Sequence, residues 1–169
     1  MRYLLLVLVF GSFLSYSQSG NYFLSHYSPG QDRLDNVCFQ AAQHQDGILY
    51  FATRSGILQF DGRNWNLVKG NGAVYTLNVV ETGEIFWGGV AGFGVISFNS
   101  TGEPELSIVA SNARNVFHSA VSNGHIYFVN EETIFDVDIE SRKIVETSLD
   151  SEGSITAIFE VAGDVYVTV

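Results

Sequence analysis

Residues 47–62 read GILYFATRSGILQFDG, two short apolar runs separated by Arg-Ser-Gly and closed by Asp-Gly. The runs are four to six residues long, rich in aromatic and β-branched residues, and bounded by turn formers, which is typical of strands. Asp61-Gly62 is a dipeptide that favours a hairpin turn. We therefore predict four antiparallel strands around this stretch: Val37–Ala41, Ile48–Thr53, Gly56–Phe60 and Asn64–Val68.

The same unit recurs downstream. Its turn glycines, Gly47, Gly83, Gly124 and Gly163, are 36, 41 and 39 residues apart, and each is flanked by apolar runs. Four short strands in a repeat of roughly 40 residues are the pattern of a β-propeller blade. A barrel or sandwich also has many short strands, but the four-segment period favours blades. The predicted fold is all-β, an incomplete β-propeller of about three and a half blades of four antiparallel strands, with blades at residues 36–69, 73–111, 115–149 and 154–169.

Alternation supports strands inside the third unit. Along residues 133–140, Phe135, Val137 and Ile139 fall on one face, and the acids Asp136 and Asp138 fall on the other. The apolar face is expected to pack in the core.

The N-terminus has the composition of a secretory signal. Arg2 precedes an apolar run over residues 3–14, which is shorter than the roughly 20 residues that a membrane helix needs. We predict a signal peptide over residues 1–17, the alternative being an uncleaved anchor. Residues 18–35 form a lead-in, in which residues 22–28 could supply a ring-closing strand.

Charge narrows the choice of partner. The chain has 18 acidic and 8 basic residues, for a formal charge of -10. Such a surface repels phosphate backbones and anionic membranes, so we expect no nucleic acid partner. Solubility alone is a sufficient explanation of the acidity.

The first unit resembles the repeat of bacterial two-component regulator propellers. The matching residues are Leu34, Asn36-Val37, Gln45-Asp46-Gly47, Leu49–Thr53, Gly56–Leu58, Phe60-Asp61-Gly62 and Trp65. The resemblance covers residues 34–65 as a motif and residues 21–169 as architecture. Later units depart from the motif, since Gly88-Gly89 replaces the threonine step and Glu131-Glu132 replaces the second glycine.

This resemblance implies the N-terminal part of an exported sensor on the periplasmic or extracellular side of a bacterial envelope. It implies signal transduction by a non-catalytic module that binds a carbohydrate or another small ligand at one mouth of the ring. Further blades, a membrane span and an output domain would belong to the full-length protein. We therefore expect the chain to be a fragment or a truncated gene product; ring closure by another chain is the alternative.

Two other functions are left open by the residues. One is a propeller-fold glycan-degrading enzyme, and the other is a protein-interaction scaffold. The sequence has no Gly-x-Ser-x-Gly nucleophile elbow and no acid–base pair that can be placed in one pocket, so we predict no catalytic residue. We also predict no cofactor and no metal site, because the histidines His26, His44, His118 and His125 are scattered.

Four further features have an ordinary explanation beside a functional one. Asp136 and Asp138 could bind calcium but are better explained as a solvated face. The glycine-rich run from Gly88 to Gly94 lacks the context of a phosphate loop and predicts a wide turn between strands. Cys38 is expected to be a small buried hydrophobe. Trp65 is the candidate ligand-binding residue, because its ring could stack on a sugar, although packing between neighbouring blades is favoured.

Overall fold

The computed structural model describes residues 37–149 and 153–169. The chain divides into two units, Met1–Gly30 and Gln31–Val169, and every described residue lies in the second. The predicted signal peptide (1–17), the lead-in (18–35) and the ring-closing strand (22–28) lie outside the described residues. Within the described ranges, no helix long and apolar enough to cross a membrane is found.

The described residues form three four-stranded antiparallel sheets and one two-stranded sheet, which we call blades 1 to 4. Blade 1 contains β1 (Cys38–Gln43), β2 (Leu49–Thr53), β3 (Gly56–Phe60) and β4 (Trp65–Lys69). Blade 2 contains β5 (Val74–Val79), β6 (Ile85–Gly89), β7 (Gly92–Phe98) and β8 (Pro104–Ala110). Blade 3 contains β9 (His118–Ser122), β10 (His125–Val129), β11 (Thr133–Asp138) and β12 (Ile144–Ser148). Blade 4 contains β13 (Ala157–Val161) and β14 (Asp164–Thr168). The prediction of four consecutive antiparallel strands per unit is confirmed in blades 1 to 3.

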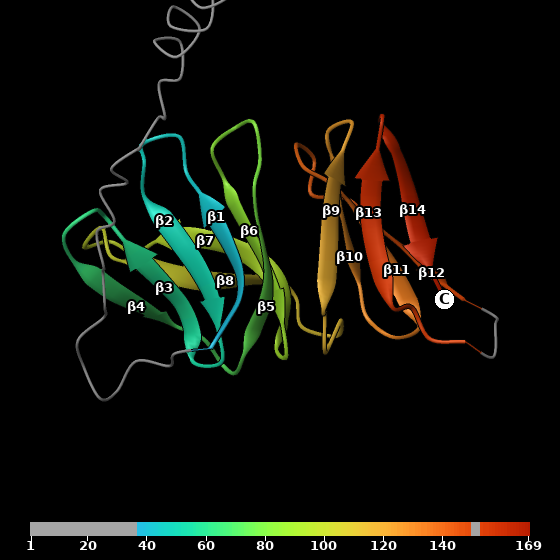
Figure 1. The fold of residues 1–169 in the computed structure, drawn as a ribbon, viewed down its shortest axis with the longest axis horizontal. Coiled ribbons are helices and arrows are strands. Elements are labelled where there is room, and N and C mark those ends of the chain that lie inside the picture. Colours follow the sequence, from blue (N-terminus) through green and yellow to red (C-terminus); the bar gives the residue numbers. More distant parts are fainter. Residues whose placement is uncertain (1–36, 150–152) are drawn as a thin grey trace, which may run out of the picture. The chain divides into compact units, whose positions relative to one another are not determined.

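The first strand of each blade contacts the first strand of the next, so β1, β5, β9 and β13 stand side by side (Figure 1). Polar side chains join these strands, and among the described residues no backbone ladder runs from one blade to the next. Gln40 on β1 donates to the carbonyl oxygen of Leu77 at 2.8 Å and accepts from its amide at 3.1 Å. The hydroxyl of Ser119 on β9 bonds to the side chains of Thr76 and Asn78 on β5.

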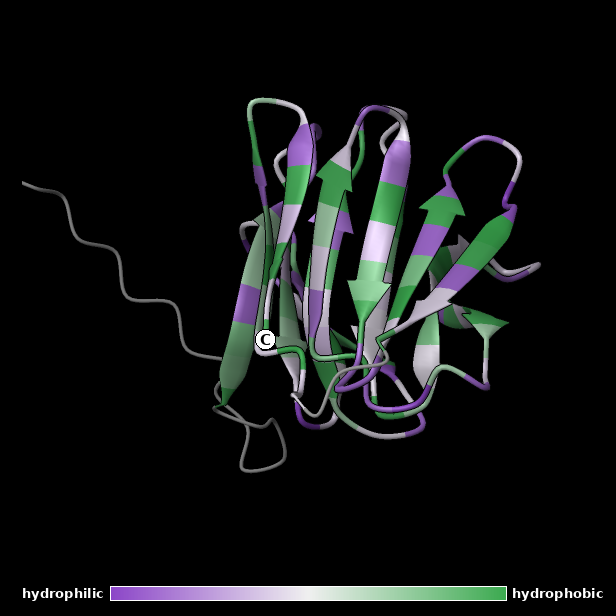
Figure 2. Ribbon diagram, turned by 90° about the vertical axis from the view of Figure 1, so that its right-hand side faces the viewer, coloured by the Kyte–Doolittle hydropathy of each residue, from purple (hydrophilic) through white to green (hydrophobic). Residues whose placement is uncertain are grey.

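Apolar side chains fill the spaces between blades. The contact between blades 1 and 2 buries Tyr50, Ile57, Val68, Leu77 and Trp87. The contact between blades 2 and 3 is the most aromatic, with the rings of Phe93 and Phe128 stacked at 4.4 Å between centroids. Hydropathy alternates along the strands in Figure 2, as expected for strands with one buried face. The predicted alternation in β11 is confirmed, because Phe135 and Val137 are only 3% and 0% exposed.

The glycine-rich run from Gly88 to Gly94 is not a wide turn, so that prediction is wrong. Gly89 pairs with Gly92 across a hairpin whose turn is only Val90-Ala91, and the other glycines lie within β6 and β7. A Cβ at Gly89 would overlap the carbonyl oxygen of Ala73, and one at Gly92 would overlap that of Ala110. Gly89 and Gly92 are there because neighbouring backbones approach too closely for a side chain, whereas a Cβ at Gly88 would meet the side chains of Val116 and Thr76.

Cys38 is exposed, so its predicted burial is also wrong. It begins β1, the first strand of its sheet, which among the described strands pairs with β2 alone. The apolar context of Val37 and Phe39 misled the prediction, because a strand at the end of a sheet leaves part of its surface uncovered.

The two hydrogen bonds between the Gln40 side chain and the backbone of Leu77 give a prediction about stability. Gln40→Ala should lower the free energy of unfolding by about 1–3 kcal/mol, because the amide and carbonyl of Leu77, a residue only 1% exposed, lose their side-chain partners. Urea denaturation followed by circular dichroism measures the change. Gln43→Ala is the matched control, because Gln43 lies exposed on the same strand. Equal losses of unfolding free energy in both variants would show that the hydrogen bonds to Leu77 are not the cause.

Candidate functional site

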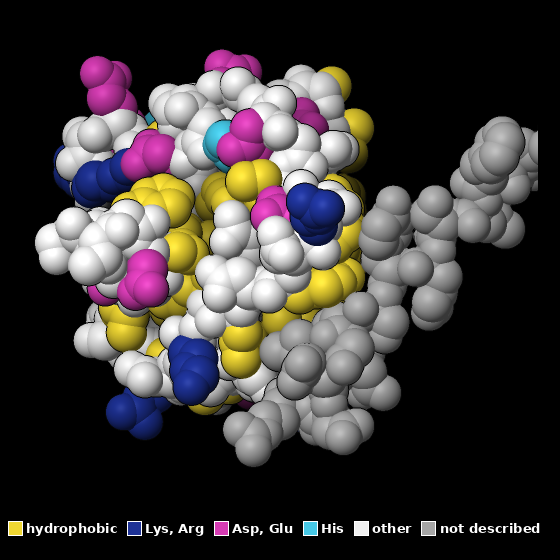
Figure 3. Space-filling model, turned by 90° about the vertical axis from the view of Figure 1, so that its left-hand side faces the viewer, with side chains coloured by type: hydrophobic (Ala, Val, Ile, Leu, Met, Phe, Trp, Pro, Cys, Tyr) yellow, Lys and Arg dark blue, Asp and Glu magenta, His cyan; other side chains and the backbone are white. Residues whose placement is uncertain are grey.

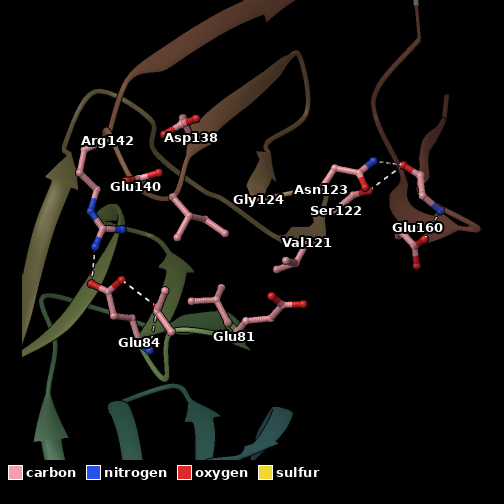
Figure 4. Close-up of a pocket in the computed structure, with 14 residues that line it drawn as sticks. Glu81, Glu84, Val121, Ser122, Asn123, Gly124, Asp138, Glu140, Arg142 and Glu160 are labelled. Atoms are coloured by element: carbon pink, nitrogen blue, oxygen red, sulfur yellow. Dashed lines mark hydrogen bonds and ion pairs between the residues drawn. The ribbon is translucent and has the colours of Figure 1, made fainter.

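A cavity of ≈ 990 Å³ opens where the first turns of blades 2, 3 and 4 meet (Figure 4). It lies at the end of β5 and β9 that leads into their hairpin turns. A further turn, between β11 and β12, brings in residues from the outer part of blade 3. The lining residues are Val80, Glu81, Thr82, Glu84, Val121, Ser122, Asn123, Gly124, Asp138, Ile139, Glu140, Arg142, Glu160 and Gly163.

Two of the turns around the cavity are tight. Asn123-Gly124 and Ala162-Gly163 each connect two paired strands with only two residues, and all four have positive φ, from 49° to 92°. Two consecutive positive φ angles define the type I′ hairpin, which matches the twist of the strands. The repeat therefore places equivalent turns from successive blades on the same side of the sheets.

Arg142 reaches from blade 3 to blade 2. Its guanidinium forms an ion pair with Glu84, 58 residues away in the sequence, and lies 4.9 Å from the ring centroid of Phe86. The two charged side chains are 35% and 39% exposed, so the pair is partly screened by solvent. Thr82 fixes the same carboxylate by donating its hydroxyl to Glu84 Oε2 at 3.0 Å. Arg142 thus forms one wall of the cavity.

The opposite wall joins blades 3 and 4. The hydroxyl of Ser122 and the side-chain Nδ2 of Asn123 both donate to the carbonyl oxygen of Gly163, at 2.7 and 2.8 Å. The amide of Gly163 in turn donates to Glu160 Oε1 at 2.5 Å. These bonds hold the two turns in a fixed relation on that side of the cavity, as Figure 4 shows.

Asp138 carries a negative charge at neutral pH. Hydrogen bonds from Ser141, chiefly from its backbone N–H to Asp138 Oδ1 at 2.6 Å, lower the pKa of this carboxyl. His125 contributes in the same direction, with its Nε2 3.8 Å from Asp138 Oδ2. The lining contains five carboxylates, including Asp138, and one guanidinium, so the cavity is rich in hydrogen-bond acceptors and negative in charge.

Trp65, the candidate from the sequence, does not line this cavity. It begins β4, and its ring stacks on Phe60 at 4.5 Å and lies 5.5 Å from Phe51, both residues of blade 1. On the side of the described residues where blade 1 lies, apolar side chains reach the surface in several separate patches (Figure 3). Because Phe51 and Phe60 both belong to blade 1, the ring contacts described for Trp65 are within its own blade.

The histidines lie apart from one another. A ring nitrogen of His44 is 2.8 Å from the carbonyl oxygen of Gly83, His118 is exposed, and His125 Nδ1 is 2.6 Å from Asp136 Oδ1. His26 lies outside the described residues. In the part of the chain that the structure describes, no three His, Cys, Asp or Glu side chains are placed to hold a metal ion.

Aromatic side chains gather at the other end of the first strands. Phe39 and Tyr75 each occupy the position where the ladder of β1 or β5 shifts register, and their rings are 5.0 Å apart. Phe117 continues the row at 5.2 Å from Tyr75. Because a β-bulge re-aims one side chain, these shifts turn the two aromatic rings out of the regular alternation.

The sequence interpretation missed Glu84, Asn123, Arg142 and Glu160. The available signal was the repeat itself, because equivalent turns must recur at the same end of successive blades. The sequence carries no comparable signal for the contact between Arg142 and Glu84. Arg142 lies in the turn between β11 and β12, whereas Glu84 lies in the turn between β5 and β6, so the two positions are not equivalent in the repeat.

No family model matches the chain, and no curated protein matches it. Among solved structures, the extracellular domain of a hybrid two-component system from B. thetaiotaomicron matches 78% of the chain at 17% identity with a TM-score of 0.61. Virginiamycin B lyase from Staphylococcus aureus matches 82% at 13% identity and 0.63, and the Pan2 WD40 domain from Neurospora crassa matches 73% at 14% identity and 0.55. The fold is a β-propeller.

The propeller fold predicted from the repeat is thus confirmed. The chain spans only part of each of these structures. It corresponds to 19% of the two-component domain, 50% of the lyase and 41% of the WD40 domain. Identities this low show the architecture alone, since one propeller fold serves unrelated functions.

Proposed function

We propose that this chain is part of an exported, non-catalytic ligand-sensing propeller, the N-terminal portion of a two-component-type regulator. The ligand is a small polar molecule such as a carbohydrate, bound in the cavity between the turns of blades 2, 3 and 4. The observation that carries this proposal is the cavity of ≈ 990 Å³ itself, whose walls come from three successive blades.

The chemistry of the lining suits a polyhydroxylated ligand. Sugar hydroxyls both donate and accept hydrogen bonds. The carboxylates of Glu81 and Glu140 can accept from such hydroxyls, and Thr82 adds a hydroxyl of its own. The volume lies within the range of small-molecule sites, about 300–1,000 Å³.

The position of the cavity gives binding a means of acting at a distance. A ligand that contacts the turns of blades 2, 3 and 4 together favours one arrangement of these blades over others. A ligand shifts a conformational equilibrium only through such differential contacts. In the full-length regulator, membrane and output domains would respond to that shift. The likeness to a two-component extracellular domain and the motif at residues 34–65 support this role.

Filling the cavity tests the proposal. Thr82→Trp should weaken saccharide binding at least tenfold, because an indole at this exposed lining position occupies ligand space. Isothermal titration calorimetry against a panel of oligosaccharides measures the change. Thr101→Trp is the matched control, placing the same ring in the exposed β7–β8 turn, outside the lining. Equal losses in both variants, or no saccharide bound by the unchanged protein, would reject the cavity as the binding site.

A glycan-degrading activity is the second candidate, and one contact favours it. His125 Nδ1 lies 2.6 Å from Asp136 Oδ1, and Asp138 beside it lines the cavity, so an acid–base group stands near the proposed site. Cleavage of a bound oligosaccharide, abolished by His125→Ala, would establish the enzyme in place of the sensor. The sensor proposal expects the bound oligosaccharide to be recovered intact.

A further inference from the structure

Among the described residues, the face of blade 4 that is turned away from blade 3 is apolar and uncovered. Ile158 and its cross-strand partner Val167 pack toward blade 3, so alternation places Phe159 and Tyr166 on the opposite face. The rings of these two residues stack at 5.9 Å between centroids, and the residues are 44% and 48% exposed. Val161, also exposed, extends the patch along β13. Contiguous exposed apolar surface of this kind marks an interaction site.

The equivalent positions of blade 3 already form an interface. Ala120 and Tyr127 are the third pair from the hairpin turn between β9 and β10. Phe159 and Tyr166 are the third pair from the turn between β13 and β14. Ala120 is buried in the apolar cluster between blades 3 and 4, and Tyr127 packs against that cluster. The outer face of blade 4 therefore continues an established interface, and the surface that covers it should be that of another blade.

Blade 1 has a face that no other blade covers among the described residues. On β1, Gln40 and Ala42 are directed at blade 2, so the intervening Ala41 lies on the opposite side of the strand. Ala41 is exposed, and its cross-strand partner Phe51 is half-buried. Figure 3 shows apolar side chains at the surface on this side of the described residues. A small side chain beside an aromatic ring leaves room for the projecting rings of blade 4.

Charge favours the same pairing. Blade 1 contains three basic residues, Arg54, Arg63 and Lys69, and two acidic ones, and no other blade has more basic than acidic residues. Residues 154–169 of blade 4 contain two acidic residues, Glu160 and Asp164, and no basic one. Opposite net charges attract blade 4 to blade 1, whereas two copies of blade 4 would repel each other.

We propose that the uncovered face of blade 4 docks onto blade 1 of a second copy of this chain, head to tail. Blades 1 and 4 stand at opposite ends of the row in Figure 1, so the same contact made twice closes a ring of two chains. Two copies of four blades give eight blade positions, within the usual range for propellers of about four to eight. The chain corresponds to 50% of virginiamycin B lyase, so two copies span the length of that protein. This inference goes beyond the proposed function, because it concerns closure of the ring and not the ligand.

Sedimentation equilibrium of the purified chain tests the proposal, which expects a dimer. Phe159→Ser with Tyr166→Ser should weaken dimerisation at least tenfold, while circular dichroism confirms that the strands remain. Phe98→Ser is the matched control, because it removes an exposed ring from blade 2, outside both faces, and should leave the dimer unchanged. An unchanged chain that is monomeric, or that assembles beyond two copies, would overturn the closed ring. So would equal weakening by the control.

The other side of the contact is tested at Ala41. Ala41→Asp places a charge on the exposed face of blade 1 without removing a core side chain, and it should also weaken dimerisation at least tenfold. If this variant dimerises as well as the unchanged chain, blade 4 is not bound to blade 1 and the proposal is wrong.

Mixing the two variants tests the head-to-tail arrangement directly. The Phe159→Ser, Tyr166→Ser variant keeps its blade 1 face, and the Ala41→Asp variant keeps its blade 4 face. One intact contact can therefore form between them, so the mixture should associate more tightly than either variant alone. No gain on mixing would overturn the arrangement.

Discussion

Gly94→Ala is expected to lower the free energy of unfolding by about 3–4 kcal/mol. A Cβ at Gly94 would overlap the carbonyl oxygen of Ser107 on β8 and would lie only 3.0 Å from the Cα of Ile108. Gly94 follows the point where the β7–β8 ladder shifts register, so its backbone lies unusually close to its neighbour. The methyl group must push β8 away and break ladder bonds. Urea denaturation with circular dichroism gives the loss.

Gly62→Ala is the control that separates crowding from backbone conformation. Gly62 has φ of +92°, but no atom lies within 4 Å of the position of an added Cβ. Its substitution should cost only about 1–2 kcal/mol, the strain of an L-residue in the left-handed region. If Gly62→Ala proved as damaging as Gly94→Ala, close approach of the backbones would not be the reason for Gly94.

Phe128→Ala should destabilise the protein by about 3–5 kcal/mol, the usual loss for a large aromatic removed from a core. Phe128 is 0% exposed and stacks on Phe93 of blade 2 with 4.4 Å between ring centroids. Truncation leaves a cavity at the contact between blades 2 and 3. The surrounding rings belong to two rigid sheets, so they can close that space only in part. The midpoint and slope of urea denaturation measure the effect.

Phe98→Ala removes the same side chain where it is 64% exposed, at the end of β7. That variant should change stability by less than about 0.5 kcal/mol. A change in Phe98→Ala comparable with that in Phe128→Ala would show that the stacked contact between blades contributes little. The comparison therefore measures how strongly packing between blades, as distinct from pairing within them, holds the propeller together.

The Gly94 and Phe128 variants test two different kinds of packing in the propeller. Gly94 is required inside one blade, where backbone meets backbone, whereas Phe128 is required between blades, where side chains interdigitate. The cavity depends on both, because its walls come from turns of blades 2, 3 and 4. A variant that loosens either level should also weaken binding at the cavity, and the lining substitutions are designed to avoid this effect.

The sequence alone determined the strands, their grouping in fours and the propeller fold. Short apolar runs, turn glycines and two-residue alternation are local signals, and the repeat multiplies each of them. The run Gly56–Phe60 is predicted with the bounds that β3 has in the structure. The buried face of β11, with Phe135 and Val137, followed from alternation alone.

The tertiary structure decided what the repeat did not encode. Arg142 meets Glu84 across 58 residues because two blades pack face to face, and no local pattern records that approach. The run of glycines predicts a turn, but Gly94 lies inside β7. A glycine is needed there because the backbone of β8 comes too close for a side chain. Cys38 is exposed because β1 ends its sheet, despite its apolar neighbours. Strand pattern is a property of neighbouring residues, whereas cavity, close approach and exposure depend on which surfaces packing brings together.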